Sequence, residues 1–448
     1  MNTKKMLAVL LTVIVLMLSF AGCGTSSNKP EPEPSKEPAA TAAEETKAEA
    51  PKSVVRTAAD RADVTGATES ITPKDFPKAF LPGIEDVGAI PLKKYKIAIS
   101  NGDMANEWRR TFWDDMMAFG NKYKEKYGIE IISANSGNNS TKQLQDIQSL
   151  LAQKPDMLIM APNESGPLSA VVDLCEKAGV SLITVDRTVD KKPGEGKYIS
   201  AIQSDGYSNG VANGISLVNK LTKKYGEPKG RVAEIAGVLG SSVAQMRSMG
   251  MRRVLADYPN IKIVTVRPGE FDRQTSFKAA QDILTVNKKG ELDAIMGSCD
   301  TSSIAAIEAI KSAGRTELLG YIWGVDGTIE AFDAIAKGEM EETNECPPYF
   351  GMIAFEYAIQ YLNGKDIPAI VPTPQRDFAM DTPAKADFMK ILIEKAKEQK
   401  LVFASSSLGG YDVLVPADME MFKKYYPKPY WEQPAAYLEE FKPYTEAK

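Results

Sequence analysis

The sequence predicts an α/β protein made of two similar domains, each built on a doubly wound parallel sheet. Two observations lead to this prediction. From residue 95 onward, short apolar runs of strand length alternate with longer stretches whose apolar residues recur at helical spacing. This alternation occurs in two successive series of similar length. Strands that alternate with helices are typical of a parallel sheet that is covered by helices on both faces.

The first series contains four strand-length apolar runs, at residues 95–99, 129–132, 157–160 and 181–185. Helices are expected between them, over 108–127 and 143–153. Gly128 and Gly179 stand where the helix ends are expected, since glycine readily takes the left-handed conformation that closes many helices.

The second series repeats this pattern, with expected strands at 231–235, 261–266, 292–296 and 319–323. Its expected helices lie at 208–224, 244–258, 273–286 and 302–313. A further helix is expected over 385–399, followed by an aromatic-rich tail.

The N-terminus has the features of a secretory signal. Lys4 and Lys5 precede a short apolar run that ends in small residues directly before Cys23. This pattern resembles a bacterial lipobox, which predicts a lipoprotein signal peptide over 1–22 and lipidation at Cys23. An ordinary cleaved signal is the alternative. The following segment is rich in Pro, Glu, Lys, Ala, Ser and Thr, and we expect residues 23–92 to form a disordered stalk and lead-in.

Composition excludes several classes of chemistry. The chain has no histidine, which removes serine–histidine and cysteine–histidine nucleophile pairs, histidine general bases and histidine metal ligands. Its four cysteines form no CxxC pair, so neither a metal nor a cofactor is expected. A formal net charge of −5 without a basic block argues against nucleic acid as a partner.

Polar, charged and aromatic residues follow the predicted strands of both series. In parallel sheets, ligands bind outside the carboxyl ends of the strands. Singly, each residue has an ordinary structural explanation, such as a helix N-cap for an aspartate. Their recurrence at several strand ends nevertheless predicts one ligand site, whose candidate residues are Asn106, Trp108, Asp186, Arg187, Arg247, Phe271, Cys299, Asp300 and Asp326.

These residue types suit a carbohydrate. Aspartate accepts hydrogen bonds from hydroxyl groups, and arginine donates through a planar fork that spans neighbouring hydroxyls. Trp108 and Phe271 offer aromatic faces on which the apolar face of a sugar ring can pack.

The loops resemble those of the periplasmic binding proteins of the ribose/galactose type, which are the receptors of sugar ABC importers. The resemblance runs from about residue 95 to 371. It depends most on the segments 183–187, 270–273 and 324–328, together with the Asn-Glu-Trp triplet at 106–108 and with Arg247. It implies a type I periplasmic-binding-protein fold in which ligand contacts with both domains favour closure about a three-strand hinge.

The resemblance also implies domain boundaries, with hinge crossings near 203–205, 346–347 and 371–376. An N-terminal domain of 93–203 plus 347–373 and a C-terminal domain of 204–346 plus 374–381 are expected. Residues 382–448 are expected to form a helical and aromatic extension, to which no chemistry is assigned.

The chain departs from the family at three positions. Arg109 stands where a second stacking aromatic residue is common in this family. Cys299 and Cys346 stand where the family has amide side chains that bind the sugar. We hypothesise that these two thiols approach each other and form a disulfide outside the cell, with two small buried thiols as the alternative.

The resulting prediction is a monomeric extracytoplasmic lipoprotein, anchored to the membrane by lipid. It captures a monosaccharide and delivers it to the membrane permease of an ABC importer. A receptor for an autoinducer-like or other small polar solute that feeds a sensor is the alternative. A carboxylate glycosidase is disfavoured because Arg187 adjoins Asp186 and keeps it ionised. A DNA-binding repressor is disfavoured because a signal and stalk precede the core instead of a helix-turn-helix.

Overall fold

A computed structural model of the chain describes residues 94–433, apart from 374, 401, 405–409 and 411–412. The predicted signal peptide over 1–22, the lipidation site at Cys23 and the predicted stalk over 23–92 lie outside the described residues. Within the described part of the chain, no helix combines the length and the apolar character that crossing a membrane requires.

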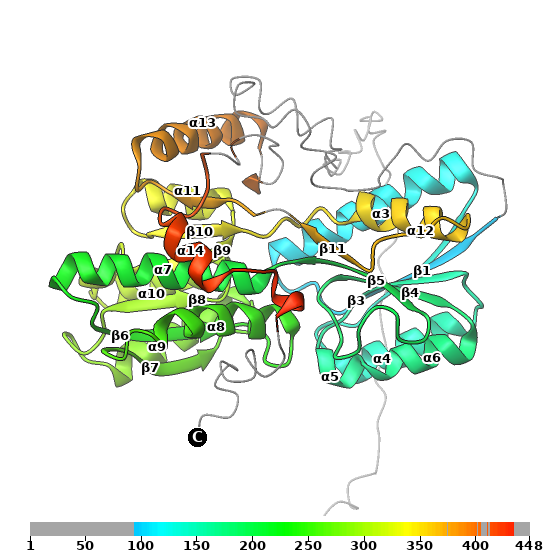
Figure 1. Cartoon of the computed structure of the whole chain (residues 1–448), viewed down its shortest axis with the longest axis horizontal. Coiled ribbons are helices and arrows are strands. Elements are labelled where there is room, and N and C mark those ends of the chain that lie inside the picture. Colours follow the sequence, from blue (N-terminus) through cyan, green and yellow to red (C-terminus); the bar gives the residue numbers. More distant parts are fainter. Residues whose placement is uncertain (1–93, 374, 401, 405–409, 411–412, 434–448) are drawn as a thin grey trace, which may run out of the picture. The chain divides into compact units, whose positions relative to one another are not determined.

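The first of two sheets is fully parallel, with the strand order β11-β5-β4-β3-β1-β2 (Figure 1). Its strands are β1 (Lys96–Asn101), β2 (Glu130–Asn135), β3 (Met157–Ala161), β4 (Ser181–Asp186), β5 (Tyr198–Ser204) and β11 (Ile370–Thr373). β3 and β4 are buried along their whole length, as expected of central strands with helices on both faces.

Two separate apolar clusters lie on the two faces of this sheet. Helices α3 (Glu107–Tyr127) and α12 (Gly351–Leu362) pack together over one face. Helices α4 (Ser140–Leu151), α5 (Ser165–Leu168) and α6 (Ala170–Ala178) cover the other face. We call this sheet and its five helices the N-lobe.

The second sheet has the order β12-β10-β9-β8-β6-β7 and is parallel except for β12, which runs antiparallel to β10. Its strands are β6 (Gly230–Ala236), β7 (Ile261–Pro268), β8 (Ala294–Gly297), β9 (Ile322–Asp326), β10 (Glu342–Glu345) and β12 (Asp377–Ala379).

This sheet is also covered on both faces, and we call it the C-lobe together with its helices. Helices α7 (Gly206–Tyr225) and α8 (Ser242–Leu255) pack on one face. On the other face lie α9 (Arg273–Val286), α10 (Asp300–Ser312), α11 (Ile329–Ala336) and α13 (Pro383–Gln399). The short η1 (Thr316–Leu318) precedes β9, and α14 (Met419–Tyr425) and η3 (Tyr430–Glu432) follow at the C-terminal end.

The predicted fold class is confirmed: two doubly wound α/β halves are joined by three passages of the chain. The chain leaves the N-lobe after β5, returns to it between β10 and α12, and passes once more from β11 to β12.

Several strands carry no strong signal in the sequence. β10 reads Glu-Thr-Asn-Glu, and its polar side chains are all buried among charged and amide partners. The predicted strand at 319–323 begins too early, because Leu319 and Gly320 leave the η1 turn and Gly320 takes a positive φ of 78°.

Candidate functional site

A small cavity of about 30 Å³ lies between the lobes, where the carboxyl ends of their strands meet. Its walls come from loops and helix starts that are far apart in the sequence, and they comprise Asn106, Trp108, Arg109, Asp186, Arg187, Val243, Arg247, Phe271, Cys299, Asp326 and Cys346. The structure therefore brings together eight of the nine residues predicted from the sequence. Asp300 is the exception.

Three of these residues have a strained backbone. Asp186, Phe271 and Asp326 have positive φ values of 64°, 58° and 137°, a region that residues other than glycine seldom occupy. Such strain persists only where the surrounding structure enforces it, and it concentrates at functional sites. Three strained positions around one cavity indicate a site that is built for a ligand.

Asp186 is the last residue of β4, and its carboxylate lies close to the guanidinium groups of two arginines. Arg109 Nη2 lies 2.6 Å from Asp186 Oδ2, and Arg187 Nε lies 3.7 Å from the same oxygen. All three side chains are buried. Burial and the neighbouring positive charge of Arg109 lower the pKa of Arg187 to about 9, against the opposing effect of Asp186. The carboxylate therefore organises two crowded guanidinium groups on the N-lobe wall.

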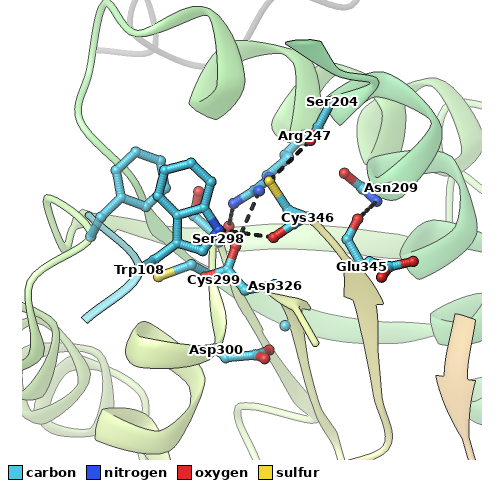
Figure 2. A network of polar contacts seen from close by, with 12 residues as sticks. Trp108, Ser204, Asn209, Arg247, Ser298, Cys299, Asp300, Asp326, Glu345 and Cys346 are labelled. Atoms are coloured by element: carbon cyan, nitrogen blue, oxygen red, sulfur yellow. Dashed lines mark hydrogen bonds and ion pairs between the residues drawn. The ribbon is translucent and has the colours of Figure 1, made fainter. Parts of the chain in front are cut away.

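Arg247 and Asp326 form the corresponding pair on the C-lobe wall (Figure 2). Arg247 Nη1 donates to the carbonyl of Ser298 at 2.6 Å, and Nη2 lies 3.4 Å from Asp326 Oδ1. Burial raises the pKa of the Asp326 carboxyl well above its usual range, and the positive charge of Arg247 acts against this rise. Burial therefore favours the protonated form of Asp326, and the charge of Arg247 counteracts this effect only in part.

The site holds buried polar atoms that are not satisfied. Among the described residues, Arg109 Nη1 on the N-lobe wall and Arg247 Nε on the C-lobe wall have no hydrogen-bond partner. Buried donors are almost always paired in folded proteins. Two unpaired guanidinium donors at one cavity therefore indicate that a bound ligand supplies the hydrogen-bond acceptors.

The two aromatic residues differ in their surroundings. Trp108 packs in the N-lobe core, stacked on Phe112 with ring centroids 5.6 Å apart, and its Nε1 donates to the Cys346 carbonyl at 2.8 Å. Only an edge of this side chain is left for the cavity, since Trp108 is 6% exposed. Phe271 instead belongs to a small cluster at the cavity itself, and the Arg187 guanidinium lies 5.3 Å from its ring centroid.

Gly237 makes room for Phe271. A Cβ atom at position 237 would lie 2.1 Å from the Phe271 ring, which is far inside contact distance. The glycine after β6 thus lets the aromatic ring reach the cavity wall.

Direct hydrogen bonds join the lobes around the cavity. Asn106 caps α3 by accepting from the amide of Arg109, and its Nδ2 donates to the Phe271 carbonyl at 2.9 Å. The Thr188 amide donates to Ser242 Oγ at 2.9 Å. A cavity of about 30 Å³ holds one or two water molecules. The structure therefore shows a closed conformation, from which a larger ligand can enter only if the lobes separate.

A larger cavity of about 330 Å³ adjoins the small one and shares Asn106, Trp108 and Asp326 with it. Its volume lies within the range of small-molecule pockets. These three shared residues form the boundary between the small cavity and the larger one.

Asp300, which was predicted to line the site, is not among the residues that line this cavity. In Figure 2 its carboxylate lies apart from the residues around Arg247. Oδ2 accepts from the amide and hydroxyl of Thr328 at 2.8 and 3.0 Å, and Oδ1 accepts from the Thr343 hydroxyl at 2.6 Å. Asp300 therefore ties the start of α10 to the loops that follow β9. A strand-end aspartate with this structural role has the same sequence signal as a ligand-binding one.

Asp300 makes a testable contribution to the pH dependence of stability. Burial raises its pKa to about 6, although the hydrogen bonds from Thr343 and Thr328 act to lower it. Because the folded state holds this proton more tightly than the unfolded state, the contribution is greatest below the unfolded pKa and is lost as the pH rises through 6. Relative to Asp300→Asn, the wild type should lose about 2–3 kcal/mol of unfolding free energy between pH 4 and pH 7. Urea denaturation at both pH values measures this difference, and a difference that does not change with pH would contradict it.

The hypothesised disulfide is also not formed. Cys299 and Cys346 are free thiols in the described structure. Cys346 Sγ donates to Ser204 Oγ at 3.2 Å, whereas Cys299 Sγ lies 3.4 Å from Ser302 Oγ. The two sulfur atoms are held by serines on different elements, although both residues line the cavity.

Three lining residues, Arg109, Val243 and Cys346, were absent from the predicted ligand set. In the sequence, Arg109 and Cys346 are only departures from the family pattern, and the pairing of Arg109 with Asp186 depends on how α3 packs. Val243 had no signal, since one apolar residue at the start of a helix is indistinguishable from core.

Two hinged lobes that close on a buried polar site define a solute-binding protein of the periplasmic type. The family model described as periplasmic binding protein domain matches residues 97–366, and the chain belongs to this family.

Several relatives of known name are similar to the chain. The ribose import binding protein RbsB of Bacillus subtilis (strain 168) is 28% identical over 254 residues, which are 56% of this chain and 78% of the relative. The galactofuranose-binding protein YtfQ of Escherichia coli (strain K12) is 25% identical over 268 residues, covering 59% of this chain and 83% of the relative.

Among solved structures, one similar protein is the periplasmic binding component of the arabinose ABC transporter from Shewanella sp. ANA-3, bound to α- and β-L-arabinofuranose. It shares 26% identity with a TM-score of 0.59, covering 68% of this chain and 97% of that chain.

Proposed function

We propose that this protein is an extracytoplasmic lipoprotein that captures a monosaccharide between its lobes and delivers it to the membrane permease of an ABC importer. The unpaired guanidinium donors of Arg109 and Arg247, which belong to opposite lobes, are the observation that carries the proposal. A hydroxylated ligand offers acceptors to both, so its binding favours the closed form over the open form. The relatives that are named for ribose, galactofuranose and arabinose support a sugar as this ligand.

The charged side chains at the site suit a hydroxylated ligand. Among the described residues, the buried guanidinium groups of Arg109, Arg187 and Arg247 lie near three buried acidic side chains, those of Asp186, Asp326 and Asp103. Asp103 is buried beside Arg187, and its charge opposes the lowering of the Arg187 pKa. Hydroxyl groups can both accept from the guanidinium groups and donate to the carboxyl groups of such a site.

A thermal-shift screen with aldoses, ketoses and polyols tests the proposal. A specific ligand at a hundred times its dissociation constant should stabilise the folded protein by about 2.7 kcal/mol, which raises Tm by several degrees. The same sugar should fail to shift a protein in which Arg247 has been replaced. A panel of monosaccharides that leaves Tm unchanged would contradict the proposed function.

The proposal of a lipid anchor is based on the sequence around Cys23. Replacement of Cys23 by serine removes the thiol that would carry the lipid, so we expect Cys23→Ser protein to leave the membrane fraction and to take up no labelled fatty acid. Cys175→Ser is the matched control, because Cys175 is buried in α6 and its loss leaves Cys23 intact. Equal labelling of the wild type and Cys23→Ser would contradict the anchor.

A further inference from the structure

One wall of the cavity is apolar. Phe271, Val243 and Cys299 belong to a small cluster of buried apolar residues, together with Val238 and Ala244, that is separate from the cores of both lobes. Cys346 continues this wall from the chain passage after β10. The apolar wall, defined as Val243, Phe271, Cys299 and Cys346, therefore combines this separate cluster with Cys346, which also belongs to the N-lobe core.

The two thiols on this wall are poor partners for a hydroxyl group. A thiol is a weak donor and a weak acceptor. Cys346 Sγ already donates to Ser204, and Cys299 Sγ lies against Ser302. Burial raises the pKa of both thiols to about 12, so they stay neutral. A hydroxyl group placed against this wall would lose its hydrogen bonds to water and could form only weak hydrogen bonds to the thiols.

The remaining cavity surface is strongly polar. Arg109, Asp186, Arg187, Arg247 and Asp326 supply guanidinium donors and carboxylate acceptors, including the unpaired Arg109 Nη1 and Arg247 Nε. The chemistry of the lining thus suits a ligand with hydroxyls along one edge and bare carbon along the other.

We propose that the ligand is a deoxy or methyl sugar whose reduced carbon faces the apolar wall. This inference rests on the proposed function and narrows its ligand class. A fully hydroxylated sugar would bury an unsatisfied hydroxyl at the wall, which should weaken its binding about tenfold or more.

Calorimetric titration of three sugar pairs tests the inference: D-galactose with D-fucose, L-galactose with L-fucose, and L-mannose with L-rhamnose. In at least one pair the 6-deoxy sugar should bind about tenfold more tightly than its parent. Cys299→Ser and Cys346→Ser, which restore a hydroxyl partner, should each reduce this ratio, whereas Cys175→Ser outside the cavity should leave it unchanged. If the parent sugar binds as tightly as its deoxy partner in every pair that shows binding, this inference is overturned. The proposed function would then still stand. Failure of all six sugars, together with failure of the wider monosaccharide screen, would overturn both.

The C-terminal segment carries a second, independent inference. Residues 419–433, here called the strap, lie beyond the family match, which ends at residue 366. The strap is bound to the C-lobe through Tyr425, whose hydroxyl donates to Asp257 Oδ2 at 2.8 Å. Its next residue, Tyr426, donates to the carboxylate of Asp205, in the first passage between the lobes.

The strap then reaches the N-lobe. Tyr430 lines one pocket together with Gln203 of β5 and Thr188 of the N-lobe. Hydrogen bonding with these two residues acts to lower the pKa of Tyr430, which burial raises to about 12. Asp205 also accepts, through its carbonyl, from Gln375 of the third passage. Tyr425, Tyr426 and Tyr430 therefore connect the C-lobe, the hinge and the N-lobe, respectively.

We infer that the strap restrains the hinge and slows the separation of the lobes. Hydrogen–deuterium exchange of the ligand-free protein measures this directly. Tyr426→Phe and Tyr430→Phe should each increase amide exchange over residues 203–208 about fivefold, since the first removes the bond to Asp205 and the second removes hydrogen bonding with Gln203 and Thr188. Tyr425→Phe is the matched control, because it removes a strap bond to the C-lobe alone. Exchange at 203–208 that is the same in all three variants would overturn the inference.

Discussion

Replacing Arg247 with methionine should weaken monosaccharide binding by at least about 100-fold. The substitution keeps most of the side-chain volume in α8 but removes every guanidinium donor of this cavity-lining residue, including the unpaired Nε. Two charge-assisted hydrogen bonds to a sugar contribute roughly 3–6 kcal/mol, which corresponds to a loss of about 10²–10⁴ in affinity. Isothermal titration with the best ligand of the thermal-shift screen measures the change.

Arg252→Met provides the control for this experiment. Arg252 lies on the same helix and pairs with Glu234 at 2.8 Å, but it does not line the cavity. Its replacement should leave affinity within a few-fold of the wild type. Arg247→Met protein that is folded by circular dichroism and still binds sugar as the control does would refute the assignment of Arg247 to the site.

Replacing Asp186 with alanine should lower the free energy of unfolding by about 3–5 kcal/mol. The change leaves the buried guanidinium of Arg109 without the carboxylate that lies 2.6 Å away, and it also removes the partner of Arg187. Loss of one member of a buried ion pair is costly because the other charge stays uncompensated. Alanine also has to adopt the positive φ of 64°, which adds roughly 1 kcal/mol.

Two further variants separate these contributions, and urea denaturation of all three gives the free energies. Asp186→Asn removes the charge but tolerates the left-handed backbone, so it should be less destabilising than alanine. Asp282→Ala breaks the exposed pair with Arg267, at 2.8 Å, and should cost less than about 1 kcal/mol. If Asp186→Ala costs no more than Asp282→Ala, the buried pair does not stabilise the fold.

Apolar periodicity was enough to predict most of the fold. The expected helix over 273–286 coincides with α9, and the expected strand over 157–160 falls within β3. Both signals are local, since one face of a helix or both faces of a central strand must be buried. β10 and β12 gave no such signal. They are held by buried ion pairs, such as that of Arg376 with Glu345 at 2.6 Å, which form only when distant segments meet.

The candidate site was predicted because strand ends gather at one edge of a parallel sheet, and this placement holds for Asp186, Arg247 and Asp326. The direction of each side chain was not predictable in the same way. Asp300 turns to Thr328 and Thr343, while Trp108 stacks largely within the N-lobe core.

The amino-acid sequence by itself determined the two-series α/β architecture and the set of loops from which a ligand site could be made, because periodicity and strand ends are local properties. Only the tertiary structure decided that Arg109 pairs with Asp186, that Cys299 and Cys346 remain separate thiols, and that the C-terminal tyrosines span the hinge. Each of these contacts joins residues far apart in the chain, and its geometry is fixed by how whole helices and lobes pack against one another.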